Sequence, residues 1–541
     1  MDKNEIINLS ITSLSSDGSG VGRHVGMAVF VPYTAPGDEV RIKIVKVRKN
    51  CAFGRVEKIL TPSPDRIAPD CPAFGKCGGC VYRHLSYGAE LRTKEQMAAD
   101  AMRRIGKIDL APEPILGAAQ PDGYRNKAQY PVSQSDGNLL IGFYAPRSHR
   151  VIDCRTCRLQ PREFETALAV FDSYIRTYNI SCYDEQTGRG LLRHIYLRRA
   201  EATGEVMACA VINGQSLPHS PALVELLRQA VPGLKSVCLN INRERTNVIL
   251  GNACKTLWGD GYITDVLCGN RIRISPLSFY QVNRTQAERL YGKVLDYLSP
   301  HGTETVLDLY CGAGTIGLSL ARHVRQVIGA EIVEQAVSDA RVNAQINGIT
   351  NARFFCADAG EAASRLKQEG IRPDAIIVDP PRKGCSEELL RVITSMSPDK
   401  LIYVSCDPAT LARDCARLTA DGWRVNAYTP VDLFPRTAHC ETVVLLSKLN
   451  TKQHIEVELN LDELDLTAAE SKATYDEIKA YVLEKYGLKV SSLYISQVKR
   501  KCGLDMGQNY NLSKKEDAKV PQCPPEKEAA IVEALKHFHM I

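Results

Sequence analysis

One cysteine of this sequence, Cys406, has the sequence surroundings expected of a catalytic nucleophile. Cys406 follows the apolar run "LIYVS" and precedes an Asp-Pro pair. That order predicts a buried strand that ends abruptly, because proline cannot continue a strand ladder. We therefore expect the thiol to face the crevice at the strand end. Since the thiolate is the nucleophilic form of cysteine, we also expect the pKa of Cys406 to be lowered.

Two carboxylates are expected near the same thiol. Asp379 ends the preceding apolar strand in "AIIVDPP", and Glu441 follows His439 at the start of the last apolar strand, "HCETVVLL". Ligands of α/β sheets bind at the carboxyl ends of parallel strands. A carboxylate at that rim is suited to act as a general base. A surface carboxylate that merely begins a strand is the alternative for Glu441.

A glycine-rich turn predicts a cofactor site. "TVLDLYCGAGTIGL" leads from an apolar strand, which Asp308 ends, through Gly312 and Gly314 into a helix start with free N–H groups. Glu331 ends the next strand, where an acid commonly binds a ribose hydroxyl pair. The third glycine that a dinucleotide fingerprint requires lies inside the helix, so the match to that fingerprint is weak. Asp358 is expected near an adenine.

The stretch "DLYCGAG" resembles motif I of S-adenosylmethionine-dependent methyltransferases. A thiol beside a methyl donor has a specific use, because C5 of uracil is a poor nucleophile until a thiolate adds to C6. After C5 has taken the methyl group, its proton must leave so that the thiol can be eliminated. Glu441 is the best candidate for the base that removes it.

Six motifs in order resemble the RNA uracil-C5 methyltransferases, and among them the 23S rRNA enzymes of the RlmD/RumA type. They are "FYQVN", "DLYCGAG", "GAE", "DPPRKG", "SCDPATLARD" and "HCE", and the resemblance covers about residues 1–449. It implies that Cys406 is the nucleophile and Glu441 the proton acceptor. It also implies that S-adenosylmethionine is bound by Gln281, Tyr310, Glu331 and Asp379.

Five further cysteines have the spacing of metal ligands. "CPAFGKCGGC" contains Cys71, Cys77 and Cys80, and "CRTC" contains Cys154 and Cys157. Spacing alone leaves two sites open: tetrahedral zinc bound by the two C-x2-C pairs, or a [4Fe–4S] cluster bound by the first array and one distant cysteine. The family resemblance implies the cluster, with Cys157 as the fourth ligand and Cys154 as an additional thiol. No step of methyl transfer uses an electron, so we expect the cluster to be structural or to position RNA.

The elements that must position these residues predict an α/β protein of four parts. Residues 1–61 are predicted to form a small β-barrel of the TRAM or OB type, and residues 62–276 a mixed α+β domain with the iron–sulfur cysteines. Helix and strand alternate over residues 277–450, which predicts a Rossmann-like methyltransferase domain. Residues 451–541 form an appended α-rich segment with an acidic strand and a helix-turn-helix pattern, to which we assign no activity.

The first part has the features of an RNA-binding surface. "VRIKIVKVRKN" alternates apolar and basic residues with one slip at Ile44-Val45, which predicts a bulged strand with a cationic outer face. Such a face is suited to RNA phosphates, although a merely solvated face is the alternative. The side chains concerned are Arg41, Lys43, Lys46 and Arg48. The target uracil must be flipped out of folded RNA to meet Cys406.

Composition is compatible with this interpretation. No apolar run reaches the roughly 18 residues of a membrane span, and the start "MDKNEIINLS" is not a secretory signal. We expect a cytoplasmic monomer without a membrane partner, in which the 19 cysteines are reduced. The net charge of +6 permits a nucleic-acid partner.

The expected substrate is 23S rRNA, and three alternatives are weighed against it. A tRNA m5U enzyme is disfavoured because such relatives generally lack both the barrel and the cysteine array. A radical tRNA-modifying enzyme with a TRAM-like barrel is disfavoured because it uses C-x3-C-x2-C. A non-catalytic RNA-binding protein is disfavoured by the presence of Cys406 and Glu441.

Overall fold

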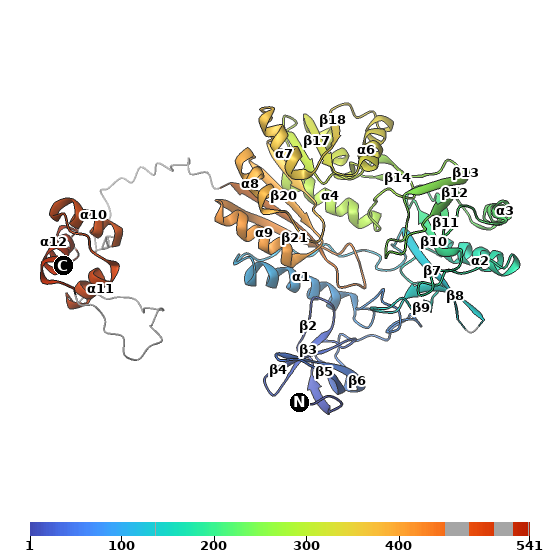
Figure 1. Ribbon diagram of the computed structural model, residues 1–541, viewed down its shortest axis with the longest axis horizontal. Helices are drawn as coiled ribbons and strands as arrows, with labels where there is room; N and C mark the ends of the chain where they lie inside the picture. The colour runs from blue at the N-terminus through green and yellow to red at the C-terminus, as the bar shows by residue number, and fades with distance from the viewer. Residues whose placement is uncertain (136, 449–474, 503–522, 539, 541) are drawn as a thin grey trace. The chain divides into compact units, whose positions relative to one another are not determined.

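The computed structural model contains two compact units, Met1–Asn450 and Thr451–Ile541 (Figure 1). The residues that it describes are 1–135, 137–448, 475–502, 523–538 and 540. Within the first unit, the predicted division at residues 61 and 276 stays a prediction.

The N-terminal sheet curls around a small apolar core. Its strand order is β1-β5-β6-β4-β3-β2, with β1 (Ile6–Ser10), β2 (Ser13–Leu14), β3 (Gly20–His24), β4 (Met27–Val31), β5 (Glu39–Val47) and β6 (Cys51–Thr61). Thr12, beyond the end of β1, donates its N–H to the carbonyl of Val21 in β3 at 2.9 Å, which bends the sheet back on itself. The predicted bulge is present, because the register of β5 and β6 shifts between Ile44 and Lys46.

A second sheet of seven strands forms the central region. Its order is β13-β12-β11-β10-β7-β8-β9, with β7 (Lys127–Ser135), β8 (Asn138–Tyr144), β9 (Val151–Asp153), β10 (Leu192–Arg199), β11 (Val206–Ile212), β12 (Leu234–Ile241) and β13 (Ala253–Gly259). Helices α2 (Arg162–Thr177) and α3 (Ser220–Ala230) pack on this sheet through a shared apolar core that includes Phe164, Phe171 and Leu223.

The third sheet has the order β18-β17-β16-β19-β20-β22-β21, which confirms the predicted methyltransferase fold. Its strands are β16 (Thr305–Leu309), β17 (Gln326–Glu331), β18 (Ala352–Cys356), β19 (Ala375–Val378), β20 (Lys400–Ser405), β21 (Trp423–Val431) and β22 (Glu441–Lys448). The first five strands along this order are parallel, whereas β22 runs antiparallel to both β20 and β21. The carboxyl ends of β16, β19 and β20 therefore meet at one rim.

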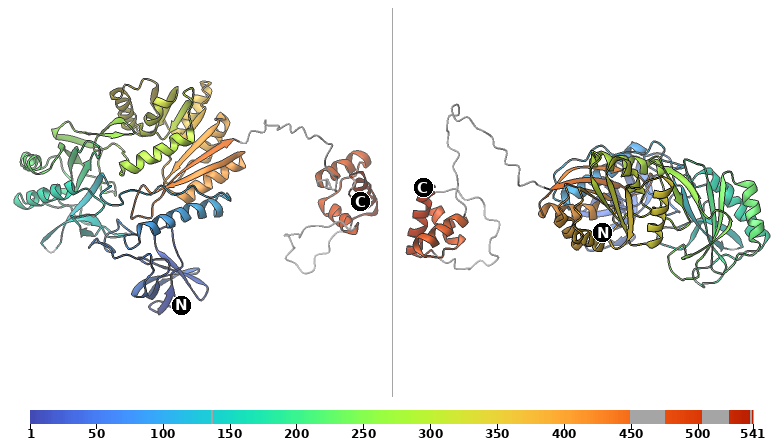
Figure 2. Two further views of the ribbon diagram at one scale, coloured as in Figure 1. Left: turned by 180° about the vertical axis from the view of Figure 1, so that it is seen from behind. Right: turned by 90° about the horizontal axis from the view of Figure 1, so that it is seen from above.

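Helices pack on both faces of this sheet (Figures 1 and 2). One apolar core includes residues of α4 (Arg284–Leu298) and α5 (Thr315–Leu320), together with the hairpin β14 (Ile263–Leu267) and β15 (Asn270–Ile274). A second core includes residues of α7 (Ala359–Gln368), α8 (Glu387–Met396) and α9 (Pro408–Ala420). Helix α6 (Glu334–Ile346) packs against β18 through a smaller cluster that contains Val337 and Phe354.

Helix α1 (Tyr87–Arg104) packs on the methyltransferase sheet, although the predicted boundaries place its sequence in the central domain. Its residues Ala98 and Met102 belong to the core beneath α9, and the helix also contacts β21. The chain after α1 runs along β21, where the N–H of Glu113 bonds the carbonyl of Tyr428 at 2.9 Å. The reason is the apolar side of α1, whose residues Ala98 and Met102 are buried against this face.

The second unit contains three described helices, α10 (Tyr475–Tyr486), α11 (Ser492–Lys501) and α12 (Pro525–His537). They share a core that includes Ile478, Ile495 and Ile531. The acidic strand predicted over residues 455–466 lies outside the described residues. Among the residues that the structure does describe, no helix has both the length and the apolar character needed to cross a bilayer.

Candidate active site

Cys406 lies between the end of β20 and the start of α9, where the sequence places it. The preceding residue, Ser405, pairs with Thr442 in the antiparallel ladder of β20 and β22. Continued by one residue, this register brings Cys406 beside Glu441, and the charge of Glu441 acts on the Cys406 thiol. Residues opposite one another in an antiparallel pair direct their side chains to the same face. The Asp-Pro pair ends the strand as expected, because Asp407 caps α9 by accepting from the N–H of Ala409 and Thr410 at 3.0 and 2.9 Å.

Glu441 is a buried carboxyl, so the alternative of a surface carboxylate is wrong. Its exposed fraction is 5%. Burial raises the pKa of Glu441 to about 8, the neighbouring Asp379 adds to the effect, and the guanidinium of Arg382 opposes it. Burial also raises the pKa of Asp379 to about 7. A carboxyl with a pKa near the working pH is well matched to proton transfer.

The expected lowering of the thiol pKa is wrong for the ligand-free chain. Burial raises the pKa of Cys406 to about 11, and the charges of Glu441 and Asp379 contribute to the rise, while Arg382 and a backbone hydrogen bond act in the opposite direction. Desolvation and two nearby carboxylates both disfavour a thiolate. The thiol is therefore protonated until something changes the charge of the crevice.

The loop that carries Asp379 is held by a residue that the sequence did not single out. Asp414 of α9 is fully buried and accepts hydrogen bonds from the N–H of Cys385 and the hydroxyl of Tyr403, at 2.9 and 2.8 Å. Arg413 donates to its other oxygen at 2.9 Å. Asp414 is the last residue of "SCDPATLARD", so one motif supplies both the thiol and the anchor of the neighbouring loop.

The glycine loop has the features of a cofactor cradle. Gly312 has φ +54°, and its N–H donates to Glu331 Oε2 at 3.1 Å, while Val333 donates to Oε1 at 2.9 Å. Gly314 has φ +79°, and a Cβ there would lie 3.0 Å from the ring of Phe354. These positions require glycine. Asp308 Oδ2 accepts from Gly317 at 3.0 Å, whereas its buried Oδ1 has no hydrogen-bond partner among the described residues, and burial raises the pKa of Asp308 to about 8.

The other predicted cofactor residues lie around this loop and the preceding turn. Tyr310 is half-buried with φ +70°, a left-handed conformation that is strained for tyrosine. Gln281 is half-buried, and its main-chain carbonyl accepts a hydrogen bond from Asn126 Nδ2 at 2.8 Å. Phe279, two residues earlier, is 62% exposed and is an aromatic side chain that sequence reasoning did not identify. Asp358 caps α7 through the N–H of Gly360 at 2.9 Å, which gives it a structural use as well.

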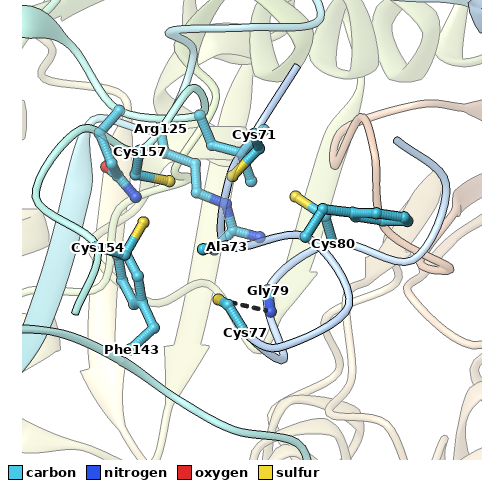
Figure 3. A pocket seen from close by; sticks show the side chains of 12 residues that line it. Cys71, Ala73, Cys77, Gly79, Cys80, Arg125, Phe143, Cys154 and Cys157 are labelled. Atoms are coloured by element: carbon cyan, nitrogen blue, oxygen red, sulfur yellow. Dashed lines mark hydrogen bonds between the residues drawn. The ribbon is translucent and has the colours of Figure 1, made fainter. Parts of the chain in front are cut away.

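The five cysteines with metal-ligand spacing line one pocket (Figure 3). They are Cys71, Cys77, Cys80, Cys154 and Cys157, and the side chain of Arg125 lies among them. Cys154, which is predicted to be a thiol besides the four cluster ligands, is within hydrogen-bonding reach of both Cys71 and Cys157. In the part of the chain that the structure describes, no three His, Cys, Asp or Glu side chains are close enough together to hold a single metal ion.

Comparison with known proteins matches this architecture to two family models. The tRNA (Uracil-5-)-methyltransferase model matches residues 270–449, and the TRAM domain model matches residues 3–56. A relative from Halalkalibacterium halodurans, described as an uncharacterized RNA methyltransferase, is 44% identical over 451 residues, which are 83% of this chain and 98% of the relative. A protein from Clostridium tetani with the same description is 41% identical over 451 residues, with the same coverage of each chain.

A solved structure also resembles this chain over most of its length. It is the Pyrococcus abyssi tRNA (uracil-54, C5)-methyltransferase in complex with S-adenosyl-L-homocysteine. Its sequence is 27% identical, the TM-score is 0.67, and the match covers 81% of this chain and 99% of the other.

Proposed function

Because this chain belongs to the S-adenosylmethionine-dependent RNA uracil-C5 methyltransferases, we propose that it methylates C5 of a uridine in 23S rRNA through a covalent intermediate on Cys406. The observation that carries the proposal is the last pair of β20 and β22, Ser405 with Thr442, which brings the next residue, Cys406, beside Glu441, whose charge acts on the thiol. A nucleophile and a base are thus paired beside the glycine loop.

The proposed reaction has three steps. The thiolate of Cys406 adds to C6, and the electron pair of the C5–C6 double bond makes C5 an enolate-like carbanion, which attacks a methyl group. When bound, S-adenosylmethionine supplies that methyl group and a sulfonium charge that favours the ionised forms of nearby acids. Glu441 then takes the proton from C5, the C5–C6 double bond forms again, and the thiolate leaves.

Residues of the chain fit the methyl donor. Glu331 has both carboxylate oxygens at the entrance of the glycine loop, where they suit a ribose hydroxyl pair. The unpartnered oxygen of Asp308 gives the loop a further buried acceptor. We assign the remaining contacts to Gln281, Tyr310 and Asp379.

We also propose a [4Fe–4S] cluster on Cys71, Cys77, Cys80 and Cys157. Zinc requires its sulfurs about 2.3 Å from a single point, whereas a cluster separates four thiolates around a core of several atoms. A pocket lined by five cysteines supports the second arrangement. Arg83, which is 2% exposed and paired with Asp70 and Asp122, adds positive charge beside the thiolates.

A uridine in tRNA is the second candidate substrate. The structure of the Pyrococcus abyssi tRNA (uracil-54, C5)-methyltransferase matches 81% of this chain, and this coverage weakens the sequence-based argument against tRNA. Either RNA would first contact the exposed Arg41, Lys46 and Arg48 of the N-terminal sheet. In this proposal the enzyme acts as a cytoplasmic monomer.

Mapping of m5U in total RNA from cells with and without the protein tests the substrate. Loss of m5U from 23S rRNA alone is the expected result. Loss from tRNA alone would replace the rRNA assignment with the second candidate. An unchanged m5U content in both RNAs, in a strain shown to lack the protein, would overturn the function.

A further inference from the structure

The loop that precedes Glu441 is held by a fully buried lysine of α1. Residues 432–440 connect β21 to β22. Lys94, with an exposed fraction of 0%, donates to Asp432 Oδ1 at 2.6 Å and to the carbonyl of Phe434 at 3.2 Å, both within this loop. It also donates to Glu90 Oε1, one turn earlier in α1, at 2.7 Å. One ammonium therefore uses all three of its hydrogens to join the helix to the loop.

The partners of Lys94 hold the same loop a second time. Glu90 Oε1 accepts from the N–H of Arg436 at 2.6 Å, and Arg436 has a left-handed φ of +70°. The hydroxyl of Tyr87 donates to Asp432 Oδ2 at 2.7 Å. Glu90 of α1 is thus bonded to the loop a second time, through Arg436, and Asp432 of the loop is bonded to α1 a second time, through Tyr87.

Residues near the cysteine pocket also donate hydrogen bonds to the loop of residues 432–440. The N–H groups of Val81 and Tyr82, which follow Cys80, donate to the carbonyl of Arg436 at 2.9 and 3.2 Å. The hydroxyl of Tyr124 donates to the carbonyl of Pro435 at 2.9 Å. Main-chain atoms five to seven residues before Glu441 are therefore fixed from two directions.

Stability alone does not account for these buried charges. Glu90, Lys94 and Asp432 all have exposed fractions of 0%. Taking such charges out of water is costly, and replacing a buried ion pair by apolar residues of similar size is often neutral or stabilising. What the charged arrangement adds is one defined geometry, since a change in the position of the loop would leave a buried charge unpaired.

We propose that Lys94 is a positioning residue for proton abstraction: it holds residues 432–440 in the geometry that keeps the Glu441 carboxylate at the C5 proton. The inference rests on the proposed function, and it adds a role for α1, a helix outside the six motifs. Lys94 acts on the last step of the reaction through Glu441. Arg382, whose charge acts on the Cys406 thiol, also bonds His439 of this loop at 3.1 Å, so the addition step is measured separately from elimination.

The order of the steps supplies a specific test. If the base is displaced, the methylated RNA remains bonded to Cys406, because elimination needs the C5 proton to leave. We expect Glu441→Gln to accumulate an RNA–protein adduct that survives a denaturing gel, and Lys94→Met to accumulate the same adduct. In single-turnover experiments, Lys94→Met should slow elimination by at least about 10-fold and change adduct formation by less than about 3-fold. Affinity for S-adenosyl-L-homocysteine should be unchanged.

Two further variants keep the test decisive. Lys94→Met removes the buried cation that Glu90 and Asp432 share, and only Glu90 keeps another, Arg436, at 3.5 Å among the described residues. Tyr87→Phe, which removes one hydroxyl and keeps the ring, therefore decides the question if the first variant does not fold. The Tyr87→Phe variant should also accumulate the RNA–protein adduct, to a smaller extent than Lys94→Met. Arg92→Met is the matched control in α1, because the side chain of Arg92 is 66% exposed and forms its ion pair with Asp65, on the surface; it should leave both rates unchanged.

The outcomes separate this inference from the proposed function. If adduct accumulates with Glu441→Gln but neither Lys94→Met nor Tyr87→Phe slows elimination selectively, Lys94 does not position the base. A parallel loss of adduct formation and elimination would show a merely structural role. Absence of any Cys406-dependent adduct in Glu441→Gln would instead overturn the proposed chemistry.

Discussion

Glu441 lies beside Cys406 at the end of the β20–β22 ladder, one residue beyond the pair Ser405–Thr442, and burial raises the pKa of the carboxyl to about 8 and that of the thiol to about 11. In the ligand-free chain both groups hold their protons at neutral pH. The pair is therefore a thiol beside a carboxylic acid, whereas the reaction needs a thiolate and then a carboxylate.

The first prediction concerns the pH dependence of the reaction. kcat/KM for RNA should rise between pH 6 and pH 9, because it reports ionisations that precede substrate binding, and Cys406 must lose a proton before it adds to C6. Steady-state methylation of a defined RNA across this range measures it. A kcat/KM that is flat or falls between pH 7 and pH 9 would contradict the raised pKa of Cys406.

The second prediction concerns stability. The folded pKa of Glu441 lies above the ordinary value near 4.3, so between about pH 4.5 and pH 8 the folded chain keeps a proton that the unfolded chain has lost. The free energy of unfolding should fall as pH rises through this window. Glu441→Gln should therefore raise the Tm by several degrees at pH 9 and hardly at pH 5.

Thermal unfolding of the unaltered chain and of Glu441→Gln, measured across this pH range, tests the prediction. Glu334→Gln is a suitable control, because the side chain of Glu334 is 68% exposed and its removal should leave the pH profile of the Tm unchanged. Equal effects of Glu441→Gln at pH 5 and pH 9 would show that burial does not perturb this carboxyl.

The third prediction concerns the nucleophile. Cys406→Ala should lower m5U formation on the order of 10⁴-fold or more, because the covalent step has no other donor of electrons to C6. No adduct should form, even in the Glu441→Gln background. Cys254→Ser is the control, since Cys254 is an exposed thiol in the central sheet. If mass spectrometry of digested RNA shows that Cys406→Ala still forms m5U, Cys406 is not the nucleophile.

The fourth prediction concerns the methyl donor. Glu331→Gln should weaken binding of S-adenosyl-L-homocysteine about 10- to 100-fold, because hydrogen bonds to a charged acceptor are worth about 1.5–3 kcal/mol. Titration calorimetry measures this affinity. Glu334→Gln, three residues further on, should bind as the unaltered chain does; a similar loss in both variants would assign the effect to local charge and not to the ribose.

The fifth prediction concerns the cysteine pocket. Protein purified without oxygen should be brown and contain about four iron atoms and four sulfides per chain. Cys157→Ser should lose the chromophore, while Cys154→Ser should retain it, although Cys154 reaches both Cys71 and Cys157. Stoichiometric zinc without iron would replace the cluster, and the reverse behaviour of the two variants would exchange their roles.

Local sequence determined the parts of this protein that depend on neighbouring residues. Periodicity and turn residues identified the strand that ends at Cys406, the bulge between Ile44 and Lys46, and the glycine loop at Gly312. Motif order also indicated the shared rim of Cys406 and Asp379, because successive strands of a parallel sheet end at the same edge.

Only the tertiary structure decided the features that depend on distant residues. The raised pKa of Cys406 comes from burial and from Glu441, 35 residues away in the sequence. The contact of Lys94 with Asp432 joins residues 338 positions apart. The pocket of five cysteines likewise brings two separate segments together. Desolvation and charge are properties of a three-dimensional neighbourhood, and residue types and spacing along the chain do not specify them.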